Sequence, residues 1–389
     1  MSSTRGFATP RPVVEGMALF ADEITDDPAV GRPATDLPTP APLVDLDVLE
    51  ANIAAMAAFF RGRPAHIRPH AKTHRAPAIA RRQVAAGAPG VTCAKVSMAE
   101  AMVNGGIQDV YIANQVISRW AVGRLCRLAQ RARVAVAVDQ PANVADLSAA
   151  ASAAGVVIDV LVELDAGLGR CGIAPGRPAL DLAKIVARAP GLRFAGLHAY
   201  EGHVVQDADA GKRTAETEKM LAITMDTRDQ MEREGLPVET VTCGGTGTYD
   251  ISGVYPGVTE HQSGSYVYMD PGYHQKVPRF GLALSLLCTV VSRPSPDRIV
   301  TDGGLQVLAT SASPPAVKGH PELRFGHLSE EHGLFLTQEG ASSDLRVGDP
   351  VEVHPGHCCA AANLHDRVFG VRQGKVAAVW LATARGCSQ

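Results

Sequence analysis

Residues 354–366, HPGHCCAAANLHD, bring three histidines, two adjacent cysteines and an aspartate together in a short stretch. If this stretch is an extended strand, side chains two residues apart share a face, so His357 and Cys359 point together while Cys358 points away. Two ligands are too few for a closed structural zinc site, but they suit a catalytic metal with open positions. Small cysteines near the end of a strand also pack well in a core, so the stretch alone leaves both interpretations open.

Two glycine-rich stretches, CGGTGTYD (243–250) and GSYVYMD (264–270), have the composition of an anion-binding site. Backbone N–H groups and hydroxyls in such turns can surround a phosphate. Glycine is also the ordinary residue of turns, so composition by itself does not decide between the two roles. The candidate phosphate-binding residues are Gly245, Thr246, Gly247, Gly264, Ser265 and Tyr266.

Lys72 stands between His70 and His74 in RPHAKTH (68–74). A lysine amine can condense with the aldehyde of pyridoxal phosphate, whose ring then stabilises negative charge on the α-carbon of an amino acid. An isolated lysine is more often a solvated charge at the surface. The neighbouring histidines and the two phosphate-binding stretches favour the cofactor.

The elements that must position these residues follow a regular alternation of strands and helices. Apolar runs predict strands at 66–70, 91–96, 110–114, 134–139, 158–165, 194–200, 240–245 and 265–270. Helical segments such as 75–87, 118–131, 178–188 and 211–235 separate them. Eight buried strands with crossover helices predict an α/β fold of the (β/α)8 TIM-barrel type. In such barrels phosphate sites follow strands seven and eight, and strand one lies next to them, so Lys72 comes close to the phosphate-binding stretches.

The barrel accounts for only part of the chain. Residues 1–40 are rich in Pro, Asp and Thr and are expected to form an extended arm. The barrel is predicted over 41–284, with the strand at 42–46 as a candidate for the next domain. From 285 to 389 short strands and turns without helices predict a C-terminal β domain that carries the candidate metal site.

Composition excludes several classes of function. The 389 residues are 46% hydrophobic and carry a formal net charge of −3, which gives no basic surface for nucleic acid or anionic membrane. No apolar run is long enough to span a bilayer. The eight cysteines are scattered and the N-terminal stretch lacks an apolar signal core, so a cytoplasmic enzyme is expected.

Eight stretches together resemble the fold-type III pyridoxal-phosphate enzymes of the D-threonine aldolase and D-serine dehydratase group, from about residue 36 to the C-terminus. They are RPHAKTHRAPAIARRQ, CAKVSMAEA, ELDAGLGRCG, FAGLHAYEG, CGGTGTYD, GSYVYMD, SEEHG and PGHCCAAANLHD. The resemblance implies an alanine-racemase-like barrel, a C-terminal β domain and a homodimer with its active site near the interface. It also implies a small D-amino acid as substrate.

The resemblance implies roles for individual residues. Lys72 matches the Schiff-base lysine, and His70 beside it falls in the cofactor site. Arg170 matches the arginine beside the phenolic oxygen of the cofactor, and Tyr200 the tyrosine near its pyridine ring. His357 and Cys359 match the two metal ligands, for zinc, manganese or magnesium.

The resemblance leaves the reaction between two alternatives. The first is a retro-aldol cleavage of D-threonine, D-phenylserine or 3-hydroxy-D-aspartate to glycine and an aldehyde. The second is a zinc-dependent D-serine or 3-hydroxyaspartate dehydratase that releases a 2-oxo acid and ammonia.

Aldolases of the group usually carry His-x-Asp at the metal position, whereas this chain has His-x-Cys, and a thiolate favours zinc. The surrounding PGHC and NLHD resemble the aldolases. A non-catalytic pyridoxal-phosphate carrier, the third possibility, usually lacks the second domain.

The catalytic base is predicted from the sixth strand. Some aldolases place a histidine next to the tyrosine, where this chain has Glu201. If the strand continues, His203 lies on the same face and is the candidate base. Glu201 would alternatively recognise the amine of a substrate.

Overall fold

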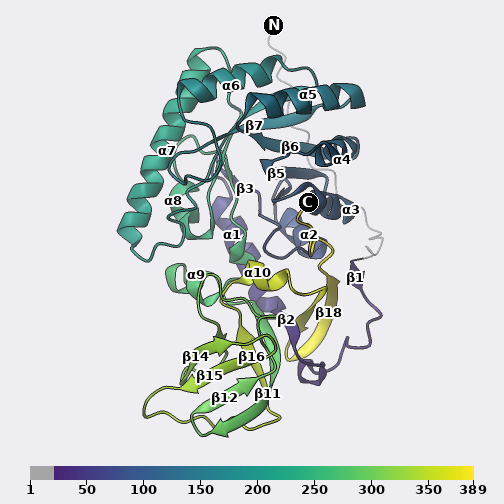
Figure 1. Cartoon of the computed structure of the whole chain (residues 1–389), viewed down its shortest axis with the longest axis vertical. Helices are drawn as coiled ribbons and strands as arrows, with labels where there is room; N and C mark the ends of the chain where they lie inside the picture. The colour runs from purple at the N-terminus through teal and green to yellow at the C-terminus, as the bar shows by residue number, and fades with distance from the viewer. Residues whose placement is uncertain (1–21) are drawn as a thin grey trace.

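The computed structural model describes residues 22–389, which form a parallel β barrel wrapped by helices and a second, mostly antiparallel sheet (Figure 1). Residues 1–21 of the predicted arm lie outside the described residues. The rest of the arm contains β1 (Glu23–Ile24), which pairs with β18 (Lys375–Leu381), and the short 3-10 helix η1 (Ala34–Asp36). Residues 22–40 of the arm therefore pack along the second sheet.

The barrel has eight parallel strands in the order β3-β10-β9-β8-β7-β6-β5-β4. A parallel bridge between His70 and Thr92 joins the segment after β3 to β4, so the ring is closed. The predicted (β/α)8 barrel followed by a β domain is confirmed. The bounds are β3 (His66–Ile67), β4 (Val91–Cys93), β5 (Asp109–Gln115), β6 (Arg133–Val138), β7 (Ile158–Leu164), β8 (Leu192–Ala199), β9 (Thr240–Cys243) and β10 (Glu260–His261).

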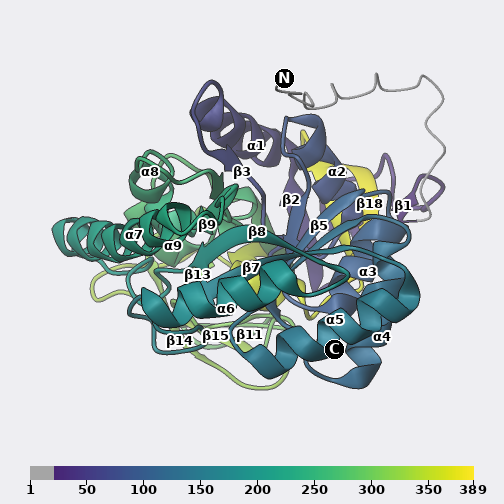
Figure 2. The same ribbon diagram turned by 90° about the horizontal axis from the view of Figure 1, so that it is seen from above.

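Helices cover the outside of the barrel, and Figure 2 shows α4, α5, α6 and α7 around β5 to β8. Every residue of β7 is buried, as expected for a strand with the barrel interior on one side and helices on the other. In α6 the buried residues include Leu180, Ala183 and Val186, three or four apart on one face. The helices are α1 (Leu46–Phe60), α2 (Pro77–Ala85), α3 (Val96–Asn104), α4 (Arg119–Ala129), α5 (Pro141–Ala154), α6 (Arg177–Arg188), α7 (Ala210–Arg233), α8 (Tyr249–Ser252) and α9 (Pro271–Lys276). Within residues 22–389, none of them combines the length and apolar content that a bilayer crossing needs.

The second sheet is built from both ends of the chain. β2 (Ala41–Asp45) lies between β11 (Leu284–Ser295) and β17 (Arg367–Arg372), so this strand pairs with the C-terminal sheet. We propose that the barrel unit ends near residue 284, where β11 begins, with β2 assigned to the C-terminal unit. The other strands are β12 (Arg298–Thr301), β13 (Ala316–Val317), β14 (Leu323–Leu328), β15 (Gly333–Thr337) and β16 (Pro350–His354).

Two expectations about local structure are wrong. Residues 265–270 were expected to form strand eight, but they begin as the 3-10 helix η3 (Ser265–Val267), and the eighth strand is β10. β10 escapes a search for apolar runs because its two residues, Glu260 and His261, are polar and yet buried. The C-terminal domain was expected to lack helices, but it contains α10 (Cys358–Ala362), which lies between the barrel and the strands of the second sheet (Figure 1).

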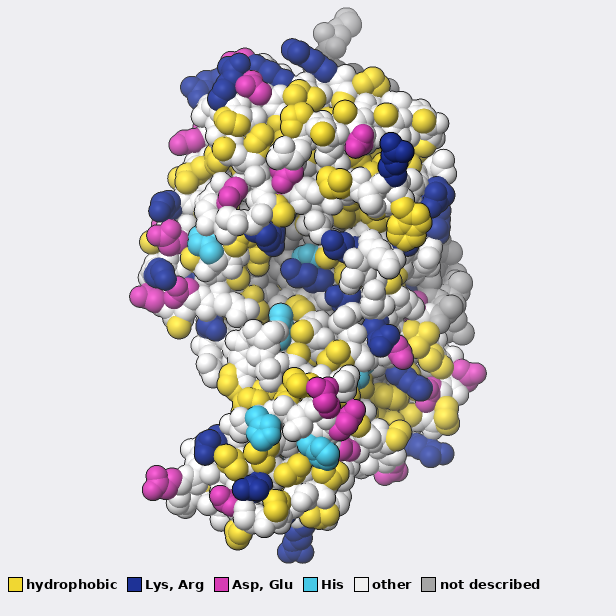
Figure 3. Space-filling model, viewed as in Figure 1, with side chains coloured by type: hydrophobic (Ala, Val, Ile, Leu, Met, Phe, Trp, Pro, Cys, Tyr) yellow, Lys and Arg dark blue, Asp and Glu magenta, His cyan; other side chains and the backbone are white. Residues whose placement is uncertain are grey.

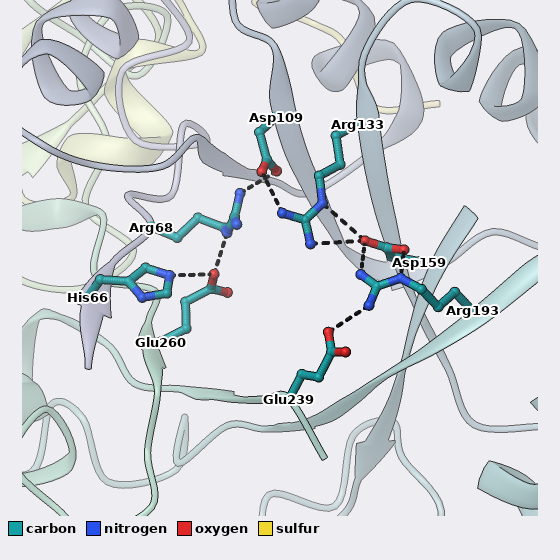
Figure 4. A network of polar contacts seen from close by, with 8 residues as sticks. All are labelled: His66, Arg68, Asp109, Arg133, Asp159, Arg193, Glu239 and Glu260. Carbon is teal, nitrogen blue, oxygen red and sulfur yellow. Dashed lines mark hydrogen bonds and ion pairs between the residues drawn. The ribbon is translucent and has the colours of Figure 1, made fainter. Parts of the chain in front are cut away.

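A chain of ion pairs closes the end of the barrel opposite the carboxyl ends of its strands (Figure 4). It passes through Glu239, Arg193, Asp159, Arg133, Asp109, Arg68, Glu260 and His66. Burial by itself raises the pKa of Glu260, but Arg68 and His66 outweigh it and hold that pKa at about 2. These charged side chains pair with one another at the amino ends of the strands. The cavity that could bind a ligand lies at the carboxyl ends.

Candidate active site

A cavity of about 1090 Å³ opens at the carboxyl ends of the barrel strands, between the barrel and α10. The hollow near the middle of the face in Figure 3 shows Lys, Arg and His side chains. Of the predicted site residues, those that line the cavity are His70, Lys72, Arg170, Tyr200, Gly245, Thr246, Gly264, Ser265, His357 and Cys359. Residues far apart in sequence thus meet at the end of the barrel where chemistry was expected.

Lys72 lies on the turn that follows β3. Burial lowers the pKa of its amine, the charge of Cys359 opposes this shift, and Arg170 and Arg75 lower the pKa further. A larger share of the amine is therefore neutral at a given pH than for an exposed lysine, and a neutral amine is the form that attacks an aldehyde.

Two buried histidines shape the turn around Lys72. The backbone N–H of Lys72 donates to Nδ1 of His70 (3.4 Å), and that of Ala76 donates to Nδ1 of His74 (3.2 Å). Burial, and then the charge of Lys72, holds the pKa of His70 well below its usual value. Burial lowers the pKa of His74 to about 4. Both rings are therefore neutral at pH 7 and support the backbone that presents Lys72.

The two glycine-rich stretches form adjacent walls of the cavity. The 3-10 helix η2 (Thr246–Thr248) and the helix η3 begin next to each other, because the backbone N–H of Tyr266 donates to Oγ1 of Thr246 (3.0 Å). A Cβ on Gly264 would lie 2.7 Å from Oγ1 of Thr73, so only glycine lets this loop approach the turn after β3. The backbone N–H groups of Thr246, Gly247 and Ser265, at the starts of these turns, have no hydrogen-bond partner, so they remain available for an anion.

Gly247 and Tyr266 are absent from the lining of the cavity and support its walls instead. A Cβ on Gly247 would collide with the carbonyl oxygen of Val205. The hydroxyl of Tyr266 accepts a hydrogen bond from Nε2 of Gln83 (2.9 Å) on α2. Both residues fix the position of the loops from behind.

Glu201 is fully buried and holds the first glycine-rich loop. Its carboxylate accepts hydrogen bonds from the backbone N–H of Gly244 (3.1 Å) and from Oγ1 of Thr248 (2.6 Å). Burial raises the pKa of Glu201, and these bonds counteract the shift. Because the carboxylate does not line the cavity, the alternative in which Glu201 recognises the amine of a substrate is wrong.

His203 does not lie beside Tyr200 as a continuing strand would place it. β8 ends at Ala199 and the chain turns, so the assumption of a continuing strand is wrong. The imidazole is exposed near Gly167, and it is not among the residues that line the cavity. In this position His203 is poorly placed to serve as the base.

Arg170 and Tyr200 form one side of the cavity. The guanidinium of Arg170 lies 5.5 Å from the centre of the Tyr200 ring, and its Nη2 lies 3.5 Å from Oε1 of Glu163. Glu163 also accepts a hydrogen bond from Nε2 of Gln115 (2.5 Å). Burial, followed by the charge of Glu201, raises the pKa of Tyr200 to about 12, so its hydroxyl keeps its proton.

His357 and Cys359 meet in the cavity, although not through a strand. β16 ends at His354, His357 caps α10 with an extended backbone, and Cys359 lies in the first turn of that helix. Cys358 is fully buried, with its Sγ 4.0 Å from that of Cys359. As predicted, Cys359 faces the site and Cys358 does not. The two residues lie on a helix, however, so the predicted strand is wrong.

The thiol of Cys359 is surrounded by hydrogen-bond donors. Its Sγ lies 3.2 Å from Oγ1 of Thr73 and 3.6 Å from Oγ of Ser265. The hydrogen bond from Cys358, and then the contact with His357, holds the pKa of Cys359 well below its usual value despite burial. The hydrogen bond to Cys359 in turn raises the pKa of His357. These contacts favour the thiolate of Cys359, the form of cysteine that binds a metal.

Two residues that sequence reasoning missed orient this pair. The hydroxyl of Ser311 lies 2.7 Å from Nδ1 of His357, so this contact orients the ring from its Nδ1 side. Asp270 accepts hydrogen bonds from the backbone N–H groups of Cys358 (3.3 Å) and Tyr273 (3.0 Å), so it links the starts of α9 and α10. Asp270 before Pro271 is a recognisable helix-capping signal, whereas nothing in the sequence around Ser311 indicates its contact.

Two protein domain families match the chain over successive ranges. The family described as alanine racemase, N-terminal domain, matches residues 44–272, and the putative serine dehydratase domain matches residues 283–371. The first match covers the barrel and the second covers most of the strands that follow it.

Individual proteins resemble the chain over most of its length. D-threonine aldolase from Arthrobacter is 38% identical over 92% of this chain and 96% of its own, and 3-hydroxy-D-aspartate aldolase from Paracoccus denitrificans is 37% identical over 93% and 96%. D-threo-3-hydroxyaspartate dehydratase from Delftia is 26% identical over 83% and 91%. The crystal structure of D-threonine aldolase from Filomicrobium marinum superposes with a TM-score of 0.90 at 41% identity and covers 92% of this chain and 99% of that one.

Proposed function

The chain belongs to the family defined by the alanine racemase N-terminal domain, and on that basis we propose that it is a pyridoxal-phosphate-dependent lyase that cleaves D-configured β-hydroxy-α-amino acids by a retro-aldol reaction. Its products are glycine and an aldehyde. The observation that carries the proposal is that Lys72, the two glycine-rich loops and the His357–Cys359 pair line one cavity. The identities support an aldolase over a dehydratase, since the relatives named as aldolases are 36–38% identical and the dehydratase is 26% identical.

The residues of the cavity fit pyridoxal phosphate. Lys72 offers an amine whose pKa burial lowers, and the loop at Gly264 approaches the turn after β3 so closely that a Cβ would fill the space. When bound, the cofactor supplies an aldehyde for amines and a ring that stabilises negative charge on the substrate α-carbon. Gly245, Thr246, Gly264 and Ser265 would hold its phosphate through backbone N–H groups and hydroxyls. Arg170 and Tyr200 would orient its ring.

The donor set of the cavity also fits a divalent metal. Within residues 22–389 no group of three or more His, Cys, Asp or Glu side chains could hold one, so His357 and Cys359 would act as a pair with open positions left for water or substrate. A bound cation would act as a Lewis acid toward a substrate hydroxyl. The thiolate of Cys359 favours zinc over manganese or magnesium. The hydroxyls of Thr73 and Ser265 donate hydrogen bonds to that thiolate.

The proton that the protein removes decides between the two reactions. Cleavage of the Cα–Cβ bond requires loss of the proton on the β-hydroxyl, whereas dehydration begins with loss of the α-proton. Lys72, partly neutral in this cavity, can accept a proton at Nζ in either case. The side chains do not choose between the reactions by themselves, so the products must be measured.

Incubation of the purified protein with D-threonine, pyridoxal phosphate and Zn²⁺ or Mn²⁺ is expected to yield glycine and acetaldehyde in equal amounts. Chelation of the metal should lower the rate, and restoring the metal should recover it. L-Threonine is the matched control and is expected to be inert. If 2-oxobutanoate and ammonia form instead, the dehydratase is the correct assignment.

Ser311→Ala is expected to weaken metal binding by roughly 10- to 100-fold, because partners that orient a ligating histidine typically contribute this much. A zinc titration against a competing chelator measures the change. Ser311→Thr keeps the hydroxyl and is the matched control, with an affinity close to that of the unaltered protein. Equal affinity in the alanine variant would mean that the contact with Nδ1 of His357 does not orient the ring.

We further propose a cytoplasmic homodimer with the cavity near its interface. All eight cysteines are free thiols, which fits a reducing compartment. Ile117 and Trp120 are more than half exposed at the start of α4, close in sequence to Asn114 and Gln115 of the cavity wall. Large apolar side chains exposed beside a site suit an interface between subunits.

A further inference from the structure

Arg75 occupies an unusual backbone conformation three residues after Lys72. Its φ is +56°, in the left-handed region that non-glycine residues rarely adopt. The backbone N–H of Arg75 donates to the carbonyl oxygen of Ala71 (2.9 Å), and its carbonyl oxygen accepts from the N–H of Ala384 (3.0 Å). The C-terminal segment therefore holds Arg75 in a conformation that costs free energy, and such positions occur often at functional sites.

The guanidinium of Arg75 is fixed but mostly unpaired. Nη1 donates to the carbonyl oxygen of Ala384 (3.2 Å), while Nε is buried without a hydrogen-bond partner. Among residues 22–389 no carboxylate lies within ion-pair distance of it, whereas Arg170, the other arginine of the cavity, contacts Glu163. A guanidinium can bind the two oxygens of a carboxylate through two of its N–H groups.

Arg75 is one of the residues that form the wall of the cavity. Arg75 lines the same cavity as Lys72 and Cys359, and its charge affects that of Lys72. In an amino acid the carboxylate and the amine are attached to the same carbon. A substrate whose amine is directed to Lys72 therefore carries its carboxylate within reach of residues that surround Lys72.

We propose that Arg75 binds the α-carboxylate of the substrate through the part of its guanidinium that Ala384 leaves unpaired, with Ala384 of the C-terminal segment holding the guanidinium in place. Arg75 is then the residue that restricts the cavity to amino acids among amines. This inference rests on the proposed function for the identity of the substrate, but it holds equally for an aldolase and for a dehydratase, since both act on an α-amino acid.

The test compares two ligands that differ in the carboxylate alone. D-Alanine and isopropylamine both lack a β-hydroxyl, so neither can be cleaved, and isopropylamine has a methyl group in place of the carboxylate. Binding to the protein loaded with pyridoxal phosphate is followed by the absorbance of the cofactor. Arg75→Gln is expected to weaken the binding of D-alanine by roughly a hundred-fold and to leave isopropylamine unchanged. For D-threonine the loss should appear in KM, with kcat changed little.

Arg75→Lys and Arg385→Gln complete the set of variants. Arg75→Lys keeps the charge without the two-pronged geometry and should recover part of the affinity, which also covers the case in which the glutamine variant folds poorly. Arg385 is in the same C-terminal segment but pairs with Asp366 outside the cavity, so Arg385→Gln should bind both ligands as the unaltered protein does. The inference is overturned if Arg75→Gln weakens the binding of both ligands equally, changes the binding of neither, or releases pyridoxal phosphate. Release of the cofactor would mean that Arg75 binds the phosphate of the cofactor instead. Loss of D-alanine binding in a protein that fails to cleave D-threonine would refute the proposed function and leave the role of Arg75 intact.

Discussion

Lys72→Ala is expected to lower kcat for D-threonine cleavage by roughly 10⁴- to 10⁶-fold, the range seen when an enzyme loses the group that forms its covalent intermediate. The side chain supplies both the amine that joins the cofactor and a site that accepts protons. Burial lowers the pKa of this amine, and Lys72 is the lysine that lines the same cavity as both glycine-rich loops and Cys359. Product formation and the chromophore fixed by borohydride are the two measurements.

Lys95→Ala is the matched control for Lys72→Ala. Lys95 precedes α3 near the same end of the barrel, but its side chain is exposed and does not line the cavity. We expect this variant to keep full activity and a fixed chromophore. If borohydride still fixed the cofactor to the Lys72→Ala protein, a different amine would be the attachment point and the assigned site would be wrong.

Cys359→Ala is expected to abolish metal retention and to lower activity by about 10³-fold, because a Lewis acid contributes several kcal/mol to such a reaction. Cys358→Ala removes a hydrogen bond that lowers the pKa of Cys359 but leaves both proposed ligands in place, so it should keep the metal and most of the activity. Cys358 is buried away from the cavity, and burial raises its pKa well above the usual value, so it is a poor ligand. Its loss should cost only about 1 kcal/mol of stability. Metal content after dialysis and the rate with D-threonine distinguish the two variants.

Cys359→Asp adds a third result to this pair. A carboxylate in place of the thiolate should shift the preference from zinc toward manganese or magnesium. We expect this variant to regain activity with Mn²⁺. The assignment of the ligands would fail if the consequences of removing Cys358 and Cys359 were exchanged.

The architecture was predictable because periodicity reports burial. β7 and α6 show this directly, since a run of apolar residues and an apolar face every three or four residues each require a particular environment. β10 was missed because its residues are polar and are buried through ion pairs across the barrel. α10 was missed because the spacing of the candidate metal ligands in HCC suggested a strand, whereas the three alanines that follow favour a helix.

The site was predictable where a role depends on residue type and unpredictable where it depends on contacts. Lys72, His357 and Cys359 have the chemistry of their proposed roles, and the structure brings them to one cavity. His203 has a suitable side chain, but the turn after β8 takes it out of the cavity. Ser311 is an ordinary loop serine until the fold places it against His357, so its contribution cannot be inferred from the local sequence.

The position of α10 has a consequence for the order of events during synthesis. Thr73 and Cys359 are 286 residues apart in the chain, yet their side chains are in contact. The barrel, with its lysine and glycine-rich loops, is complete well before the ribosome adds residues 357–359. The residues proposed to hold the cofactor therefore precede those proposed to hold the metal, and the metal pair is complete only when α10 has docked on the barrel. If His357 and Cys359 bind a metal as proposed, metal loading would report that the two units have assembled.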